Sequence, residues 1–224
     1  PKDWGRIKKL GKGISFWLGD GREGRPDRLG TTIQRKIDGE KDLRADVWAV
    51  HDGTYLYFLA EVHDDNYEPF DKENRKNMCY QEDMFRIIID SANSYRPNIP
   101  EPLSNQPGYE GFGYSTDGNI YGDWSDFIVP GEPKKRPEPG SGPDGESWKA
   151  ACTVKKLEDG YLYTYEERIA LAGRPGRNMM PLAPGNSYGL NLEVCDADNG
   201  VQLEGYLLWS SDGKTSDFNY TNLF

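Results

Sequence analysis

Residues 47–65 read Val-Trp-Ala-Val-His-Asp-Gly-Thr-Tyr-Leu-Tyr-Phe-Leu-Ala-Glu-Val-His-Asp-Asp, and this stretch decides the class of fold. Its second half places apolar side chains at every other position: Leu56, Phe58, Ala60 and Val62. Such period-two alternation is typical of a β-strand with one buried face. Asp52-Gly53 separates this run from the apolar run before it, which predicts a tight antiparallel hairpin.

Further runs of the same kind follow along the chain. They cover residues 84–90, 111–124 with a turn at Asp117-Gly118, 148–169 with a turn at Asp159-Gly160, 187–195 and 203–209. No long segment has helical periodicity, and the best short candidate is 71–78. Short strands separated by turn signals predict a sandwich or barrel of antiparallel sheets.

The length of 224 residues suits one all-β domain spanning 1–224. Residues 130–147 hold five of the fifteen prolines, and because strands are expected on both sides, we interpret them as a Pro/Gly-rich surface loop rather than an interdomain linker. Three tryptophans fall within expected strands and are assigned to the core: Trp48, Trp148 and Trp209.

The charge balance narrows the class of partner. A formal net charge of -10 argues against nucleic acid and anionic membranes, which require a basic face. No apolar run approaches the length of a membrane span, so no membrane insertion is expected. Cys79, Cys152 and Cys195 are widely spaced, which leaves one disulfide plus a thiol, or three thiols, as alternatives. The first residue, Pro1, suggests either a processed protein, such as a secreted one that has lost its signal peptide, or an excised piece of a longer chain.

Three segments together resemble the family 9 carbohydrate-binding modules. Residues 47–65 are similar to the family's strand, turn and "D-x-x-Y-L-Y" strand, and residues 80–90 (Tyr-Gln-Glu-Asp-Met-Phe-Arg-Ile-Ile-Ile-Asp) resemble "W-x-x-D-S-V-E-x-F-I-D". Residues 160–198 are similar to "G-Y-x-x-E-x-x-I-P" followed by "G-x-x-I-G-F-N-x-x-x-N-D". The resemblance implies a two-sheet antiparallel β-sandwich, jelly-roll-like with long loops, in an extracellular or cell-surface protein with other domains.

The same resemblance implies a non-catalytic module that holds a polysaccharide or oligosaccharide between two aromatic rings. Tyr80 stands where the first ring is expected, and Asp217 and Phe218 fall near the second. Arg86 replaces a glutamate of the family pattern, and because a guanidinium grips a carboxylate with two hydrogen bonds, an acidic glycan is expected. Two further rings at strand ends or in loops are candidate contacts, Tyr109 and Trp124.

Acidic residues end two of the expected strands, as Asp64 and Asp65 and as Asp196 and Asp198. Calcium requires about six to eight oxygen ligands, which carboxylates and loop carbonyls at strand ends supply. The family resemblance favours a structural calcium here, against the alternative of solvated acidic turns.

No hydrolase or nucleotide-binding motif is present, so we expect no enzyme. Two other functions remain open. One is a structural subunit of an extracellular or cell-surface assembly. The other is a haem-binding, cytochrome-like sandwich, for which the nominal ligands are Met78, Met84, His63 and Met179.

Overall fold

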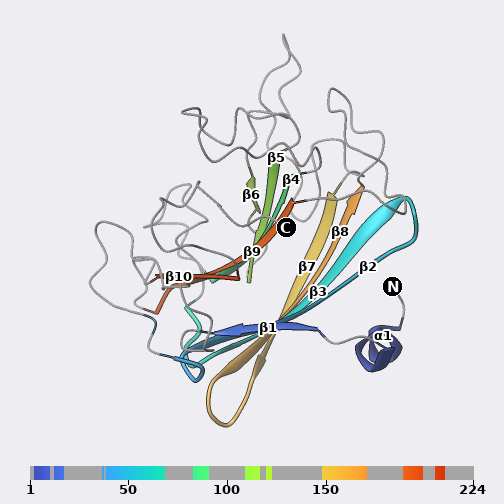
Figure 1. Cartoon of the computed structure of the whole chain (residues 1–224). Coiled ribbons are helices and arrows are strands. Elements are labelled where there is room, and N and C mark those ends of the chain that lie inside the picture. Colours follow the sequence, from blue (N-terminus) through green and yellow to red (C-terminus); the bar gives the residue numbers. More distant parts are fainter. Residues whose placement is uncertain are drawn as a thin grey trace, which may run out of the picture.

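The computed structural model describes residues 3–10, 13–17, 37, 39–68, 83–90, 109–116, 120–122, 148–170, 189–198 and 205–209. These form two layers of antiparallel strands (Figure 1). The predicted two-sheet antiparallel sandwich is therefore confirmed.

The first layer, sheet A, has the strand order β1-β2-β3-β8-β7. Its strands are β1 (Ile14–Trp17), β2 (Leu43–His51), β3 (Tyr55–Asp64), β7 (Trp148–Lys156) and β8 (Tyr161–Ala170). The second layer, sheet B, has the order β10-β9-β4-β5-β6. Its strands are β4 (Met84–Asp90), β5 (Tyr109–Ser115), β6 (Ile120–Gly122), β9 (Gly189–Asp196) and β10 (Gly205–Leu208).

Two of the three predicted Asp-Gly hairpins are seen directly. β2 pairs with β3 across Gly53, which has φ +92°, and β7 pairs with β8 across Gly160, which has φ +137°. Residues with these positive φ values are strained unless they are glycine, which explains why Asp-Gly marks these turns. Asp117-Gly118 lies outside the described residues, although β5 and β6 on either side pair antiparallel.

The core lies between the two sheets and consists of side chains at alternate positions of the strands, as the sequence pattern predicts. Sheet A contributes Phe58, Ala60 and Val62, and sheet B contributes Phe85 and Ile87, among others. Trp148 is buried in this core as predicted, and Trp209 packs against it while partly buried. Trp48 was wrongly assigned to the core. It is half-buried on the outer face of sheet A, the face directed away from sheet B, where Lys8 Nζ lies 4.6 Å from the ring centroid.

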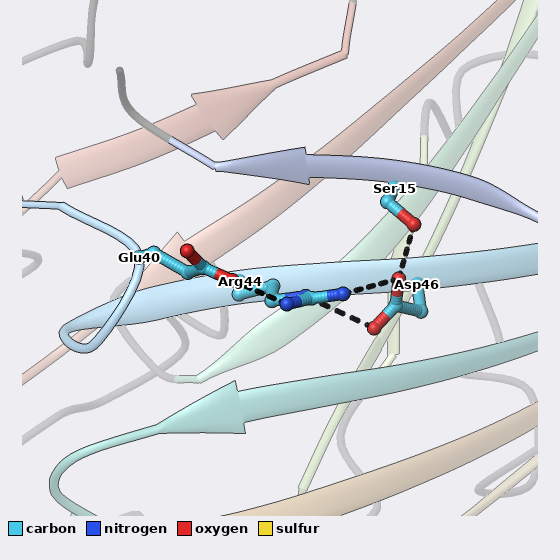
Figure 2. A network of polar contacts seen from close by, with 4 residues as sticks. All are labelled: Ser15, Glu40, Arg44 and Asp46. Atoms are coloured by element: carbon cyan, nitrogen blue, oxygen red, sulfur yellow. Dashed lines mark hydrogen bonds and ion pairs between the residues drawn. The ribbon is translucent and has the colours of Figure 1, made fainter. Parts of the chain in front are cut away.

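The N-terminal segment adds two elements that alternation did not reveal, the helix α1 (Trp4–Leu10) and the edge strand β1. A polar network holds β1 beside β2 (Figure 2). Ser15 Oγ donates to Asp46, which also accepts from Arg44 at 3.1 and 3.2 Å, and Arg44 pairs in addition with Glu40. The core position of Phe16 then anchors the short strand.

The remaining predictions fall partly outside the described chain. The candidate helix 71–78 and the expected loop 130–147 are not among the described residues, so both stay predictions. β6 and β7, on either side of that loop, belong to opposite sheets of the sandwich. In the described part of the chain, neither Cys152 nor Cys195 forms a disulfide, and Cys79 is not described. Within the described residues, no helix has the length and apolar character needed to cross a membrane.

Candidate metal centre at one end of the sandwich

Acidic side chains from both sheets meet at one end of the sandwich. Antiparallel pairing brings the start of β2 beside the end of β3, and the start of β4 beside the end of β9. Asp42 directly precedes β2, Asp64 ends β3, Asp83 directly precedes β4, and Asp196 ends β9. Topology alone therefore gathers carboxylates that lie far apart in the sequence.

Asp64, Asp196 and Asp198 form a first group of carboxylates. Each offers one oxygen, and these three oxygens lie within 4.8 Å of one another. The side chains of Asp64 and Asp196 are buried, with 3% and 1% of their surface exposed, whereas Asp198 is half-buried. Three carboxylates so close together, two of them buried, repel one another unless protons or a cation neutralise them.

A second, more exposed group consists of Asp42, Asp65 and Asp198, whose carboxylate oxygens also lie within 4.8 Å of one another. The backbone N–H of Asp65 donates to the carbonyl of Asp42 at 3.2 Å, which fixes the two acidic turns against each other. Asp198 belongs to both groups. The five side chains Asp42, Asp64, Asp65, Asp196 and Asp198 are called the acidic cluster below.

Asp83 organises the segments around the acidic cluster. Its Oδ1 accepts the backbone N–H of Ala197 at 3.0 Å, and its Oδ2 accepts the Tyr163 hydroxyl at 3.1 Å. Its backbone carbonyl accepts the Tyr165 hydroxyl at 3.3 Å. Nearby, Asn66 Nδ2 donates to the carbonyl of Asp198 at 2.9 Å. These bonds join the ends of strands from both sheets.

The pKa values at this end are shifted strongly. Burial, reinforced by the charges of Asp83 and Asp196, raises the pKa of Asp64 well above its ordinary value. Burial also raises the pKa of Asp83 to about 7, although the Tyr163 hydroxyl and two backbone N–H groups oppose the shift. A bound divalent cation would replace the protons that these carboxyl groups otherwise retain.

Gly160 closes the β7–β8 hairpin directly against the acidic cluster. A Cβ atom at this position would lie 2.3 Å from the backbone oxygen of Asp64. Only glycine therefore lets the turn approach the end of β3 so closely. The predicted Asp159-Gly160 turn thus also shapes the candidate metal centre.

The donor set suits calcium. Every candidate ligand in the acidic cluster is an oxygen, the donor that hard cations such as Ca²⁺ prefer. Asp64 Oδ1 accepts the backbone N–H of Asn66 at 2.8 Å, whereas its buried Oδ2 accepts no hydrogen bond from the described part of the chain. An oxygen of this kind is costly to bury unless a proton or a cation meets it.

All four metal ligands expected from the sequence lie in the acidic cluster, although the calcium ion itself stays a prediction. Sequence reasoning missed Asp42 and Asp83. Asp42 lies next to the end of β3 only because β2 and β3 form a hairpin, with Leu43 opposite Asp64. The Asp52-Gly53 turn fixes this register. Counting residues back from the turn along both strands would therefore have placed Asp42 beside the end of β3.

The expected sugar contacts are mostly not described. Tyr80, Trp124, Asp217 and Phe218 lie outside the described residues. Tyr109 is the first residue of β5, opposite Asp90 in β4, and its side chain is not described. These five positions stay predictions.

Arg86 lies within β4 on the face of sheet B that is directed away from sheet A. Its side chain is 2% exposed, and its Nη1 lies 3.5 Å from Oε1 of Glu193, the residue opposite it in β9. The guanidinium covers Gly111, where an added Cβ would lie 2.7 Å from Nη2. Arg86 is therefore part of a buried ion pair.

The nominal haem ligands do not meet among the described residues. His63 is exposed on the outer face of sheet A, whereas Met84 is buried in sheet B. Met78 and Met179 are not described. No observation in the described chain favours the haem alternative over the others.

No protein-family model and no curated protein matches this chain. Among solved structures, a putative carbohydrate-binding protein from Bacteroides uniformis superposes with a TM-score of 0.51 and 13% identity, covering 90% of this chain and 83% of its own. A family 9 carbohydrate-binding module from Caldicellulosiruptor kristjanssonii, at 18% identity, gives TM-scores of 0.48 in complex with cellotriose and 0.49 in complex with glucose. Those two superpositions cover 87% and 84% of this chain, and 83% and 86% of the module.

The likeness to the Bacteroides uniformis protein is one of fold. It extends over most of both chains. The two-sheet architecture implied by the three sequence segments is thereby confirmed.

Proposed function

We infer that this chain is an extracellular, non-catalytic module that binds carbohydrate and whose sandwich is held at one end by calcium. The observation that carries this proposal is the likeness of fold to a putative carbohydrate-binding protein over 90% of the chain. The ordered resemblance of residues 47–65, 80–90 and 160–198 to the family 9 modules adds to it. Because folds host many functions, the binding site itself has to be tested.

The expected ligand is a polysaccharide or an oligosaccharide. Aromatic rings stack on the apolar C–H face of a sugar, and Tyr80 and Phe218 are the rings that the sequence places for this role. The preference for an acidic glycan suggested by Arg86 is less well supported. Glu193 already lies 3.5 Å from the guanidinium, so an acidic sugar at Arg86 would have to compete with a buried carboxylate.

The calcium proposal rests on the acidic cluster. A divalent cation bound by Asp64, Asp196 and Asp198 would offset their mutual repulsion and tie the end of β3 to the end of β9. Because β3 belongs to sheet A and β9 to sheet B, such an ion would join the two layers. Its role would be structural, since nothing about this geometry requires a reacting substrate.

Carbohydrate binding is tested by calorimetric titration of the protein with cello-oligosaccharides, xylo-oligosaccharides and polygalacturonate. We expect saturable binding to at least one of them, and loss of the binding of neutral oligosaccharides in Tyr80→Ala and Phe218→Ala. Thermal unfolding of both variants checks that the sandwich persists. Failure of the wild-type protein to bind across a broad glycan array would overturn the proposed function.

Calcium binding is tested with terbium, which replaces calcium and luminesces when a nearby tyrosine is excited. The Tyr163 hydroxyl lies 3.1 Å from Asp83 Oδ2, so we expect strong sensitised emission that calcium competes away. Asp64→Asn should abolish the emission, whereas Asp159→Asn, in the exposed hairpin turn, should retain it. An unfolding temperature that is the same with calcium and with chelator would refute a structural calcium.

A further inference from the structure

The outer face of sheet A carries a pair of tyrosines that the acidic cluster does not involve. Tyr55 and Tyr57 are two positions apart in β3, so both rings project from the same face of the strand. That face is the outer one, because Phe58, Ala60 and Val62 at the alternate positions fill the core. The ring centroids lie 6.1 Å apart with a tilt of 54°, and both side chains are half-exposed.

Asp52 fixes this pair of rings. Its Oδ2 accepts the Tyr57 hydroxyl at 2.8 Å, and its Oδ1 accepts the backbone N–H groups of Thr54 and Tyr55 at 2.9 and 2.8 Å. These bonds lower the pKa of Asp52, led by the bond from the Tyr55 backbone, so the carboxylate stays charged and keeps the ring of Tyr57 in place. A ring that is already positioned loses little entropy when it meets a ligand.

Two cations lie beside the rings. Arg168 is opposite Tyr57 in the pairing of β3 with β8, and Lys149 is opposite Arg168 in the pairing of β8 with β7. The Arg168 guanidinium stacks on Tyr55, with Cζ 4.3 Å from the ring centroid. A guanidinium that lies over a ring still carries N–H groups at its edge, and such groups can grip a carboxylate with two hydrogen bonds. Lys149 is exposed on the edge strand.

The charge of this region is mixed. Arg168 and Lys149 lie opposite each other on neighbouring strands, about 5 Å apart in the hydrogen-bonding direction, whereas the Asp52 carboxylate beside Tyr57 and the exposed Glu166, two positions from Arg168 in β8, bring negative charge close to them. One row across strands β3, β8 and β7 consists of Tyr57, Arg168 and Lys149. This row combines an aromatic ring with positive charge. A chain of sugars that bears carboxylates has the complementary pattern, an apolar C–H face and regularly spaced negative charge.

We propose that Tyr55, Tyr57, Arg168 and Lys149, the tyrosine–arginine patch, form a second carbohydrate-binding surface that takes a carboxylate-bearing polysaccharide. The rings receive the C–H face of one sugar unit, and Arg168 and Lys149 pair with its carboxylate and that of its neighbour. This inference rests on the proposed function and adds a separate surface to it. The arginine of this patch is half-buried, in contrast to Arg86, which is 2% exposed.

The patch is well separated from the acidic cluster. Tyr55 and Asp64 are the two ends of the ten-residue strand β3, which places them roughly 30 Å apart at about 3.3 Å per residue. At such a distance charges are screened at physiological salt, so calcium at the acidic cluster should not alter the affinity of the patch directly. The two sites can therefore be tested independently.

The test is titration of the intact protein with polygalacturonate, a linear polymer of a uronic acid, and with neutral cello-oligosaccharides. Arg168→Gln is expected to weaken binding of polygalacturonate about tenfold or more, and Tyr55→Ala by a similar factor. Lys149→Gln should weaken it severalfold, and its exposed side chain makes a folding defect implausible as the cause. Added salt should weaken the wild-type complex more than the Arg168→Gln complex.

The matched control is Lys155→Gln, an exposed lysine of the same strand β7 that lies opposite Leu162, away from the patch. It should bind polygalacturonate as the wild type does. If polygalacturonate binds and both Arg168→Gln and Lys149→Gln bind it unchanged, the patch is refuted while the proposed function stands. Binding of neutral oligosaccharides without polygalacturonate likewise refutes the patch alone, and binding of no glycan overturns both proposals.

Discussion

The hydroxyl of Tyr163, in β8 of sheet A, lies 3.1 Å from Oδ2 of Asp83, the residue that precedes β4 of sheet B. The same hydroxyl lies 2.6 Å from the carbonyl oxygen of Asn66. Both Tyr163 and Asp83 are buried, and the raised pKa of Tyr163 has burial as its largest cause, with the Asp83 charge next. One tyrosine thus links the two layers of the sandwich at the acidic end.

Tyr163→Phe should lower the free energy of unfolding by about 1–3 kcal/mol, because it removes the buried hydroxyl that contacts both the Asn66 carbonyl and Asp83 Oδ2. Among the described residues, that carboxylate oxygen then keeps only the Glu68 backbone N–H, at 3.4 Å. Urea unfolding followed by tryptophan fluorescence measures this. The control is Tyr161→Phe in the same strand, where the ring is half-buried and packs on Tyr67 with 5.6 Å between centroids. Equal losses in the two variants would show that the Tyr163 hydroxyl is not the important group.

Without metal, the protein should become less stable as the pH rises. The pKa of Asp83 is about 7 in the folded chain against an ordinary 3.8, so between these values the folded state holds a proton that the unfolded state has released. Stability from this group is complete below about pH 4 and declines towards pH 7. We expect the unfolding temperature in chelator to fall across this window, and excess calcium to reduce or reverse the fall; parallel curves with and without calcium would contradict the expectation.

Glu167→Gln should remove a second source of pH dependence. Glu167 lies in the core and accepts the Trp148 indole N–H at 2.9 Å, and burial raises its pKa well above the ordinary 4.5. The wild type should therefore lose stability above about pH 4.5 relative to the variant, by up to about 1.4 kcal/mol for each pH unit until the folded pKa is reached.

Urea unfolding between about pH 5 and pH 9 measures this difference. Glu166→Gln is the matched control, because Glu166 is the exposed neighbour in the same strand and should show no such trend. A constant difference between wild type and Glu167→Gln across the range would mean that the carboxyl group does not titrate differently in the folded state.

Gly160→Ala should be far more damaging than Gly53→Ala. Both glycines have positive φ, but a Cβ at Gly160 would lie 2.3 Å from the Asp64 backbone oxygen, whereas nothing lies within 4 Å of a Cβ at Gly53. Gly53→Ala should cost about 1 kcal/mol from backbone strain, and Gly160→Ala at least twice as much. Thermal unfolding compares them, and terbium emission should weaken only in Gly160→Ala; similar losses in both would speak against the close approach.

The strands could be predicted because their signals are local. The alternation over residues 55–62 and the Asp52-Gly53 turn each depend on only a few neighbouring residues. The observed strand ends at Asp64, just beyond the alternating run. Trp48 shows the limit of such reasoning. It lies in a strand as expected, but which face of the strand points inward depends on what the other sheet covers, and here Lys8 of the distant N-terminal helix lies over its ring.

The sequence shows that aspartates end several strands, and this predicted a metal centre. It does not show which of these aspartates lie together as ligands. Asp64 and Asp196 were expected separately, and their proximity results from the packing of sheet A on sheet B, which sequence spacing does not encode. Asp83 was overlooked because its role depends on Tyr163 and Ala197, which come from two other parts of the chain. Arg86 was expected to contact a ligand. Its position opposite Glu193 in β9 could not be predicted from either segment alone.

The order of strands in sheet A has a consequence for how the chain folds. β2 with β3 and β7 with β8 are local hairpins closed by short turns, whereas β3 and β8 pair residues far apart in the sequence. Loop closure makes that third pairing the slow one, so we expect the two hairpins to form early and dock late. Tyr57 and Arg168 lie on different hairpins and meet only on docking, so neither hairpin alone would carry the tyrosine–arginine patch.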